Sequence, residues 1–133
     1  MSDTTKNDNR APMFKKVAFT MYPVKDPKRA RAFYGETLGL KLGSHSPDGV
    51  WTEYDLPGGG CLGLFGGPDA KPSSDAGGMV AFEVDDLDAL IARLKTQGVT
   101  FKAEMIPSPV CRMSIILDSE GNAVMLHELK KKR

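Results

Sequence analysis

The stretch VKDPKRARAFY, residues 24–34, recurs in altered form 60 residues later as VDDLDALIARL, residues 84–94. In each copy an acidic residue precedes apolar residues at helical spacing, which predicts a capped amphipathic helix directly after a strand. Asp26 is the expected cap of the first helix, and Asp85 or Asp86 that of the second. A repeat of this kind indicates that the chain consists of two copies of one supersecondary unit.

Three short extended runs follow each predicted helix, separated by residues that favour turns. The runs are LKLGSH, VWTEYDL and CLGLFG in the first half, and TFKAE, CRMSIIL and AVMLHEL in the second. PGGG joins the last two runs of the first half, and DSEGN joins those of the second. Each half is therefore predicted to be a strand, a helix and three further strands.

The boundaries of these units follow from composition. A Gly-, Pro-, Ser- and Asp-rich linker separates the halves. We expect a single domain at 14–129, made of module 14–66, linker 67–78 and module 79–129. The polar lead 1–13 is expected to be disordered, and the basic tail 130–133 to be a solvated end.

Composition excludes several function classes. The chain has 133 residues, 41% of them hydrophobic, and a formal net charge of +1, so no strong field favours nucleic acid or a membrane surface as a partner. The polar start lacks the apolar segment of a signal peptide, and no apolar run reaches the length of a membrane helix. A cytoplasmic location is expected. Cys61 and Cys111 lack CxxC spacing and are interpreted as reduced thiols.

The two helical stretches, VKDPKRARAFYGETLGLKLG and VAFEVDDLDALIARLKTQGV, together with the final DSEGNAVMLHE, resemble the vicinal oxygen chelate superfamily. This is the glyoxalase I, bleomycin-resistance and extradiol-dioxygenase group. The resemblance implies an α+β fold in which paired βαβββ modules form a cupped mixed sheet around a cavity. It also implies a homodimer, with the modules paired within one chain or exchanged between two.

In metalloenzymes of this superfamily four side chains hold a divalent cation that acts as a Lewis acid. Matched to this chain, the resemblance places those positions on Phe19, Gly63, Met79 and Met125. None of these offers the carboxylate or imidazole that a hard divalent ion requires. We therefore predict no metal at these positions and no cofactor, and a divalent metal is disfavoured.

Alternation along the strands sorts the remaining residues by face. In the last hairpin we expect Leu117 to pair with Val124. This register places Arg112, Ser114 and Ile116 on the cavity side of the sheet. Met113 and Ile115 are then on the helix side. Glu53 and Tyr54 are left undecided, because the glycine-rich turn leaves the register of their strand open. The predicted ligand-binding cavity consists of Phe19, Met21, Gly63, Met79, Glu83, Arg112, Ser114, Ile116, Met125 and His127.

Such a cavity is mostly apolar with a few polar groups, as in small-molecule sites. Arg112 would grip a carboxylate or phosphate, or else form an ion pair with Glu83. Glu83 and His127 are candidates for acid–base catalysis. The sequence thus predicts a protein that binds a small, mostly apolar molecule with a polar or anionic group. The alternatives are a lyase, isomerase or dioxygenase-type enzyme, using a displaced metal site or Glu83 and His127, and a dimeric accessory or regulatory module.

Overall fold

The computed structural model describes Met13 and residues 16–130. Apart from Met13 and Lys130, the expected disordered lead 1–13 and basic tail 130–133 lie outside the described residues.

The first half of the chain forms a four-stranded sheet in the order β1-β4-β3-β2. Its elements are β1 (Thr20–Val24), α1 (Pro27–Ala32), the π-helix η1 (Phe33–Thr37), β2 (Leu42–His45), β3 (Trp51–Asp55) and β4 (Cys61–Gly66). β1 runs parallel to β4, and the other pairs are antiparallel. We call this sheet A.

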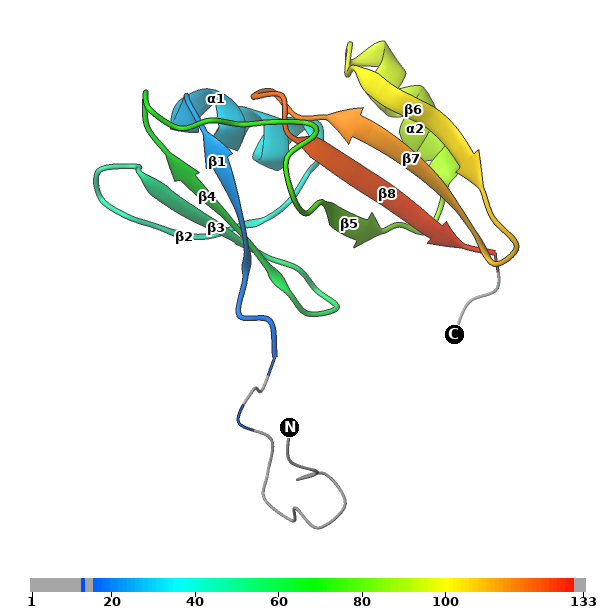
Figure 1. Cartoon of the computed structure of the whole chain (residues 1–133), viewed down its shortest axis with the longest axis horizontal. Coiled ribbons are helices and arrows are strands. Elements are labelled where there is room, and N and C mark those ends of the chain that lie inside the picture. Colours follow the sequence, from blue (N-terminus) through cyan, green and yellow to red (C-terminus); the bar gives the residue numbers. More distant parts are fainter. Residues whose placement is uncertain (1–12, 14–15, 131–133) are drawn as a thin grey trace, which may run out of the picture.

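The second half repeats the arrangement as sheet B, with strand order β5-β8-β7-β6. Its elements are β5 (Val80–Glu83), α2 (Leu87–Thr96), β6 (Phe101–Pro107), β7 (Cys111–Leu117) and β8 (Ala123–Leu129). Again the first strand is parallel to the last, β5 to β8, while the other pairs are antiparallel. β1 and β5 are end strands of their sheets and face the middle of the molecule (Figure 1).

Both helices begin as the sequence predicts. The Asp26 carboxylate accepts a hydrogen bond of 3.1 Å from the backbone N–H of Arg29, and Asp86 accepts one of 3.1 Å from that of Ala89. The first helix differs from expectation after Ala32, where it continues as η1. Helical spacing does not separate these two forms over so short a segment, because both bury the same apolar side chains.

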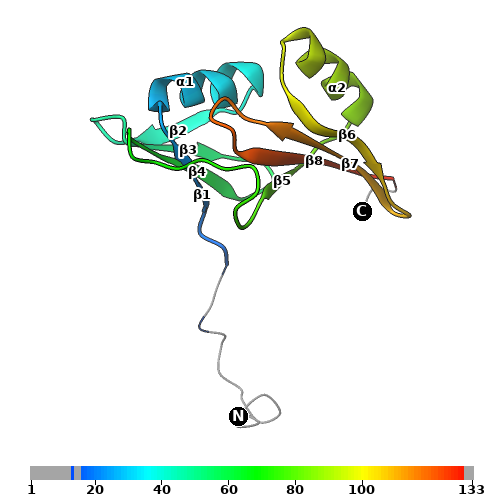
Figure 2. The same ribbon diagram turned by 45° about the horizontal axis from the view of Figure 1, so that its top comes forward.

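Both helices lie on the same side of the two sheets (Figure 2), and the two modules share one core there. Its members come from the helices and from alternate strand positions: Tyr22, Val24, Ala30, Phe33, Tyr34, Tyr54, Leu62, Leu64, Phe82, Leu87, Ile91, Leu94, Ile116, Val124 and Leu126. We call the opposite side of each sheet its helix-free face. None of the described helices is both long and apolar enough to cross a bilayer.

A polar contact, which we call the latch, ties the β7–β8 turn to the first module. Glu120 accepts hydrogen bonds of 3.0 Å from the backbone N–H groups of Lys25 and Asp26, and its other oxygen lies 2.7 Å from Arg29 Nε. The Tyr34 hydroxyl donates to Asp118 at 2.7 Å. These bonds fix the relative position of the two modules.

Candidate functional site

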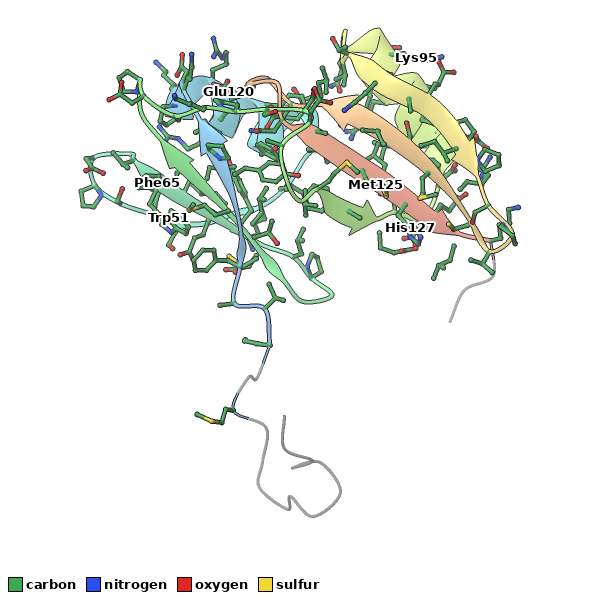
Figure 3. All side chains as sticks on the ribbon, in the orientation of Figure 1. Trp51, Phe65, Lys95, Glu120, Met125 and His127 are labelled. Carbon is green, nitrogen blue, oxygen red and sulfur yellow. The ribbon has the colours of Figure 1, made fainter. Side chains whose placement is uncertain are left out.

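Three aromatic side chains gather on the helix-free face of sheet A, and we call them the aromatic platform. Trp51 is at the centre, with its ring centroid 5.2 Å from that of Phe19 and 6.4 Å from that of Phe65. The Trp51 Nε1–H donates to Glu53 at 2.6 Å, which holds the indole in one orientation. Phe19 and Phe65 are 46% and 50% exposed, so the platform faces outward (Figure 3).

Gly63 makes room for the indole. A Cβ atom at this position would lie 2.4 Å from Cη2 of Trp51, a separation that packed atoms do not tolerate. The resemblance placed a metal ligand here in metalloenzymes, yet in this chain the residue has no side chain because Trp51 occupies the space above it.

The helix-free face of sheet B carries thioethers and one polar pair. Met125 lies opposite Ile115, and His127 lies opposite Met113. His127 Nδ1 lies 2.7 Å from a Glu83 carboxylate oxygen, and the backbone N–H of Leu129 donates to the other oxygen at 3.3 Å. Figure 3 shows Met125 and His127 on the same strand, β8.

The Glu83–His127 pair has the geometry of an oriented imidazole. When Nδ1 carries the proton, it donates to the Glu83 carboxylate, and the lone pair of Nε2 is then available as a base. An acid–base role for this pair stays a prediction, because it requires a substrate proton near Nε2.

The predicted register of the last hairpin is wrong by one residue. Leu117 pairs with Ala123, not with Val124, so Ile116 pairs with Val124 on the core side. A slip of one residue exchanges the two faces of a strand. Ile116 and Ser114 are accordingly buried on the helix side, where Ser114 donates to the Ala103 carbonyl. Their predicted place in the cavity is therefore wrong.

The same slip moves Met113 and Ile115 to the helix-free face, opposite to the prediction. It also determines the side of the sheet on which Arg112 lies, and this residue was expected in the cavity. Its guanidinium lies 2.7 Å from Glu128 and 3.1 Å from Asp88 of α2, on the helix side. The expected ion pair between Arg112 and Glu83 is therefore wrong, because Glu83 bonds to His127 instead.

The other predicted cavity residues lie on the helix-free faces or next to them. Met21 and Gly63 are neighbours across β1 and β4, and Phe19 precedes β1. Met79 precedes β5 in the same way and is 40% exposed. In β3, where the sequence left the facing open, Glu53 is on the helix-free face beside Gly63, while Tyr54 is buried in the core.

Sequence reasoning missed the aromatic platform. Neither Trp51 nor Phe65 is among the predicted cavity residues. Alternation from Gly63 was the available signal, because Phe65 is two residues further along the same strand and so shares its face. The signal for Trp51 was its register opposite Phe65, which the open turn concealed.

The residues at the four expected ligand positions do not fit a hard divalent metal. Phe19, Met79 and Met125 offer a ring or thioethers, and Gly63 offers no side chain. Within the described part of the chain, one group of potential metal ligands comes together, formed by Glu53, Asp55 and Cys61. Burial, followed by the two carboxylates, raises the pKa of the Cys61 thiol, so an ion at this group would have to displace the thiol proton.

A cavity of about 610 Å³ lies at the junction of the two modules, between the β3–β4 turn and β5. Its walls are mostly apolar, and it is lined by Leu38, Leu40, Leu56, Pro57, Gly58, Gly59, Ala81, Phe82, Glu83, Val84, Asp85, Leu90 and Leu126. We call it the junction cavity. No residue pattern in the sequence predicted it, because it depends on how the modules sit against each other.

Comparison with known proteins agrees with the fold. The model of the Glyoxalase/Bleomycin resistance protein/Dioxygenase superfamily matches residues 16–126. Among curated proteins, none is significantly similar in sequence.

Three solved structures illustrate the likeness. TnmS3, an antibiotic binding protein from Streptomyces sp. CB03234, is 27% identical, with a TM-score of 0.75 over 90% of this chain and 100% of that one. A glyoxalase/bleomycin resistance protein from the same organism is also 27% identical, with a TM-score of 0.66 over 84% and 98%. A glyoxalase/dioxygenase from Nostoc punctiforme is 21% identical, with a TM-score of 0.77 over 94% and 99%.

The family resemblance seen in the sequence and the predicted α+β fold of paired βαβββ modules are both confirmed. The chain belongs to the Glyoxalase/Bleomycin resistance protein/Dioxygenase superfamily.

Proposed function

We propose that this protein binds a small, flat, mostly apolar molecule on its helix-free faces, with the aromatic platform as the main contact. The observation that carries the proposal is Trp51 lying over Gly63 between two exposed phenylalanines. Aromatic rings supply large apolar contact area and favour stacking on other rings. An indole held by a hydrogen bond to Glu53 is already ordered, so little entropy is lost when a ligand binds.

A second copy of the chain is part of the proposal. Met21 and Phe65 are 51% and 50% exposed on sheet A, and Met79 is 40% exposed beside sheet B. Apolar side chains gathered on one face of a protein mark a surface that a ligand or partner covers. A homodimer with two-fold symmetry would close these faces over the ligand.

The charges on the helix-free faces favour a neutral or positively charged ligand. Glu53 and Asp55 lie on sheet A, and Glu83 lies beside His127 on sheet B. Arg112, the residue on which the expected anionic group depended, is bonded to Glu128 and Asp88 on the other side of the sheet. These charges thus favour a ligand whose polar part is a hydrogen-bond donor or a cation over a ligand with an anionic group.

Similarity to TnmS3 supports a binding role, because that relative is described as an antibiotic binding protein. The four expected metal positions carry no ligating side chains, so they cannot hold the cation that acts as the electrophile in the metalloenzymes. This also supports a binding role.

The test uses a neutral aromatic probe, N-phenyl-1-naphthylamine, whose fluorescence rises in apolar surroundings. The indole N–H signal of Trp51 in ¹⁵N-labelled protein reports binding at the platform itself. We expect this signal to shift saturably with probe concentration, and its half-saturation concentration to rise by about tenfold in Phe65→Ala, because truncating a stacking ring removes a large part of the contact area. Val110→Ala is the control, since Val110 is 67% exposed in the β6–β7 turn, outside the platform. The same half-saturation concentration in both variants would rule out the platform as the site.

An acid–base enzyme is the second candidate, favoured by the 2.7 Å contact between His127 and Glu83. Small molecules released from protein purified from its native cells, identified by mass spectrometry, would be incubated with the protein and followed for turnover. On this reading His127→Gln abolishes turnover but leaves probe binding intact. If no released compound is converted by the unchanged protein, the enzyme reading fails and the binding proposal stands.

A further inference from the structure

Two turns of the molecule are closed by equivalent hydrogen bonds but carry different side chains. Leu56–Gly60 joins β3 to β4, and Asp118–Asn122 joins β7 to β8. The backbone N–H of Leu56 donates to the Gly60 carbonyl at 3.1 Å, as that of Asp118 does to the Asn122 carbonyl at 2.8 Å. The fourth residue is a glycine with φ of 107° in one turn and 95° in the other. The two turns therefore align from first to fifth residue, although the fifth residue has a φ of 95° in Gly60 and no positive φ in Asn122.

In the second turn every alternate side chain contributes to the latch. Asp118 accepts from the Tyr34 hydroxyl, and Glu120 binds the start of α1 together with Arg29. The Asn122 side chain donates to the Pro23 carbonyl at 2.9 Å. Asp118 and Asn122 are buried as a result.

In the first turn the corresponding positions are Leu56, Gly58 and Gly60, which have none of these polar groups. The helix next to this turn, α2, also lacks side chains that could bond to such groups. By the repeat that relates the modules, Ala89 of α2 replaces Arg29, and Leu94 replaces Tyr34. A second latch cannot form, and the junction cavity of about 610 Å³ lies in its place.

We propose that the junction cavity is a second ligand site, separate from the aromatic platform, for a small apolar molecule that is neutral or positively charged. Its volume falls in the range of about 300–1,000 Å³ that small-molecule sites occupy. Leucine, valine, phenylalanine and proline side chains form most of the wall, and Leu56, Leu90 and Leu126 are among them. These groups supply the apolar contact that gives affinity.

The charged residues of the lining determine which ligand charge the cavity favours. Glu83 and Asp85 are exposed and border the cavity, and none of the described lining residues is basic. A ligand carboxylate or sulfonate would meet like charge there, and none of these lining side chains would donate to it as a lysine or arginine does. The cavity therefore selects against anions, whereas the latch at the other end of the junction holds the Glu120 carboxylate through Arg29.

The β5 strand gives the cavity a polar edge as well. β5 is the end strand of sheet B and pairs only with β8 among the described strands. In a parallel pair, alternate residues turn their backbone groups toward the neighbour, and the remaining residues turn theirs away. Since Val84 donates to the His127 carbonyl, the backbone groups of Ala81 face away from β8 and toward the cavity. They can bond a donor or acceptor on the ligand.

The test compares two probes with the same aromatic core: neutral N-phenyl-1-naphthylamine and the anionic 1-anilinonaphthalene-8-sulfonate. Amide chemical shifts of ¹⁵N-labelled protein locate each probe. We expect the neutral probe to shift the amides of Gly58, Gly59 and Ala81 in a saturable way. The anionic probe should bind there at least about tenfold more weakly, since one unpaired charge is disfavoured by roughly that factor.

A double variant introduces the second latch that the first turn lacks. In the double variant G58E/A89R, the new carboxylate and guanidinium occupy the cavity as Glu120 and Arg29 occupy the other end. A Cβ added at Gly58 would meet no atom within 4 Å, and the φ of this residue is not positive, so the position accepts a side chain. Shifts at Gly59 and Ala81 should disappear, while Gly67→Glu, at an equally open position, retains them.

Two further variants keep the result interpretable. If the double variant does not fold, Leu90→Trp fills the cavity from α2 and should abolish the same shifts. Phe65→Ala should leave them unchanged, because it alters the aromatic platform alone. The proposal is overturned if no probe shift appears at Gly58 and Gly59, or if the shift at Gly59 persists in a folded cavity-filling variant.

Discussion

The indole of Trp51 covers Gly63 so closely that residue 63 cannot carry a side chain without moving the ring. This relationship converts a position that the family resemblance associates with metal binding into the floor of an aromatic surface. It links one glycine in β4 to the orientation of Trp51 and, through the Nε1–Glu53 bond, to the shape of the proposed binding face.

Gly63→Ala should destabilise the fold by about 1–3 kcal/mol, because the added methyl overpacks the contact with Trp51. The indole should also be displaced, and its emission should shift to the red. Denaturant unfolding and tryptophan fluorescence measure the two effects. Gly67→Ala is the control, since a Cβ there meets no atom within 4 Å. Unchanged stability and emission in Gly63→Ala would contradict the described packing.

Arg112→Ala should leave binding of the neutral probe unchanged, because Arg112 lies on the helix side with Glu128 and Asp88. It should lower stability only slightly, because ion pairs that are partly exposed to solvent contribute little. Arg93→Ala, which removes an exposed arginine from the same helix layer, is the control. Weaker probe binding in Arg112→Ala alone would return this residue to the cavity.

Glu120→Gln should reduce stability at neutral pH by about 2 kcal/mol, since the carboxylate accepts charge-assisted bonds and its side chain is fully buried. The bond to Arg29 is the main cause that lowers the pKa of Glu120 from 4.5 to about 2. A lowered pKa means that the stabilisation is present above pH 4.5 and is lost as pH falls toward about 2.

Acid unfolding of the two proteins therefore measures the latch. The unchanged protein should lose stability across that window more steeply than Glu120→Gln, which has no carboxylate to protonate. Glu104→Gln provides the comparison, because Glu104 forms an exposed ion pair with Lys95. A Glu120→Gln curve parallel to that of the unchanged protein would show that the latch contributes little.

Protein purified from its native cells should contain much less than one divalent ion per chain. The four expected positions lack hard ligands, and an ion at the Glu53, Asp55 and Cys61 group would have to displace the proton of a thiol whose pKa is raised. Elemental analysis by mass spectrometry measures this. A stoichiometric ion that disappears in Glu53→Gln would instead identify the Glu53, Asp55 and Cys61 group as a metal centre.

Local signals in the sequence were sufficient for the elements. Asp26 and Asp86 cap their helices as the pattern indicates, and β7 and β8 begin and end at the predicted residues. Capping and strand alternation depend on neighbouring residues, so a single chain reveals them. The π-helical continuation at Phe33 was not visible, because the apolar spacing suits either helix.

The candidate site depended on register, which local signals do not determine. One residue of slip between Leu117 and Ala123 was enough to place Ile116 and Arg112 on the wrong face. In β3 the glycine-rich turn left the facing of Glu53 and Tyr54 undecided, so the position of Trp51 on the same strand did not follow and the platform was missed. The junction cavity was hidden for a further reason, since its walls come from both modules and depend on the latch at Glu120.

The shift of the Trp51 indole N–H signal on titration with N-phenyl-1-naphthylamine tests the aromatic platform most directly, because Trp51 is the one tryptophan of the chain and does not line the junction cavity. The expected result is a saturable shift, with a half-saturation concentration that rises by about tenfold in Phe65→Ala and stays the same in Val110→Ala. A shift that does not saturate, or that has the same half-saturation concentration in both variants, would contradict the proposal that the rings around Trp51 form the binding surface.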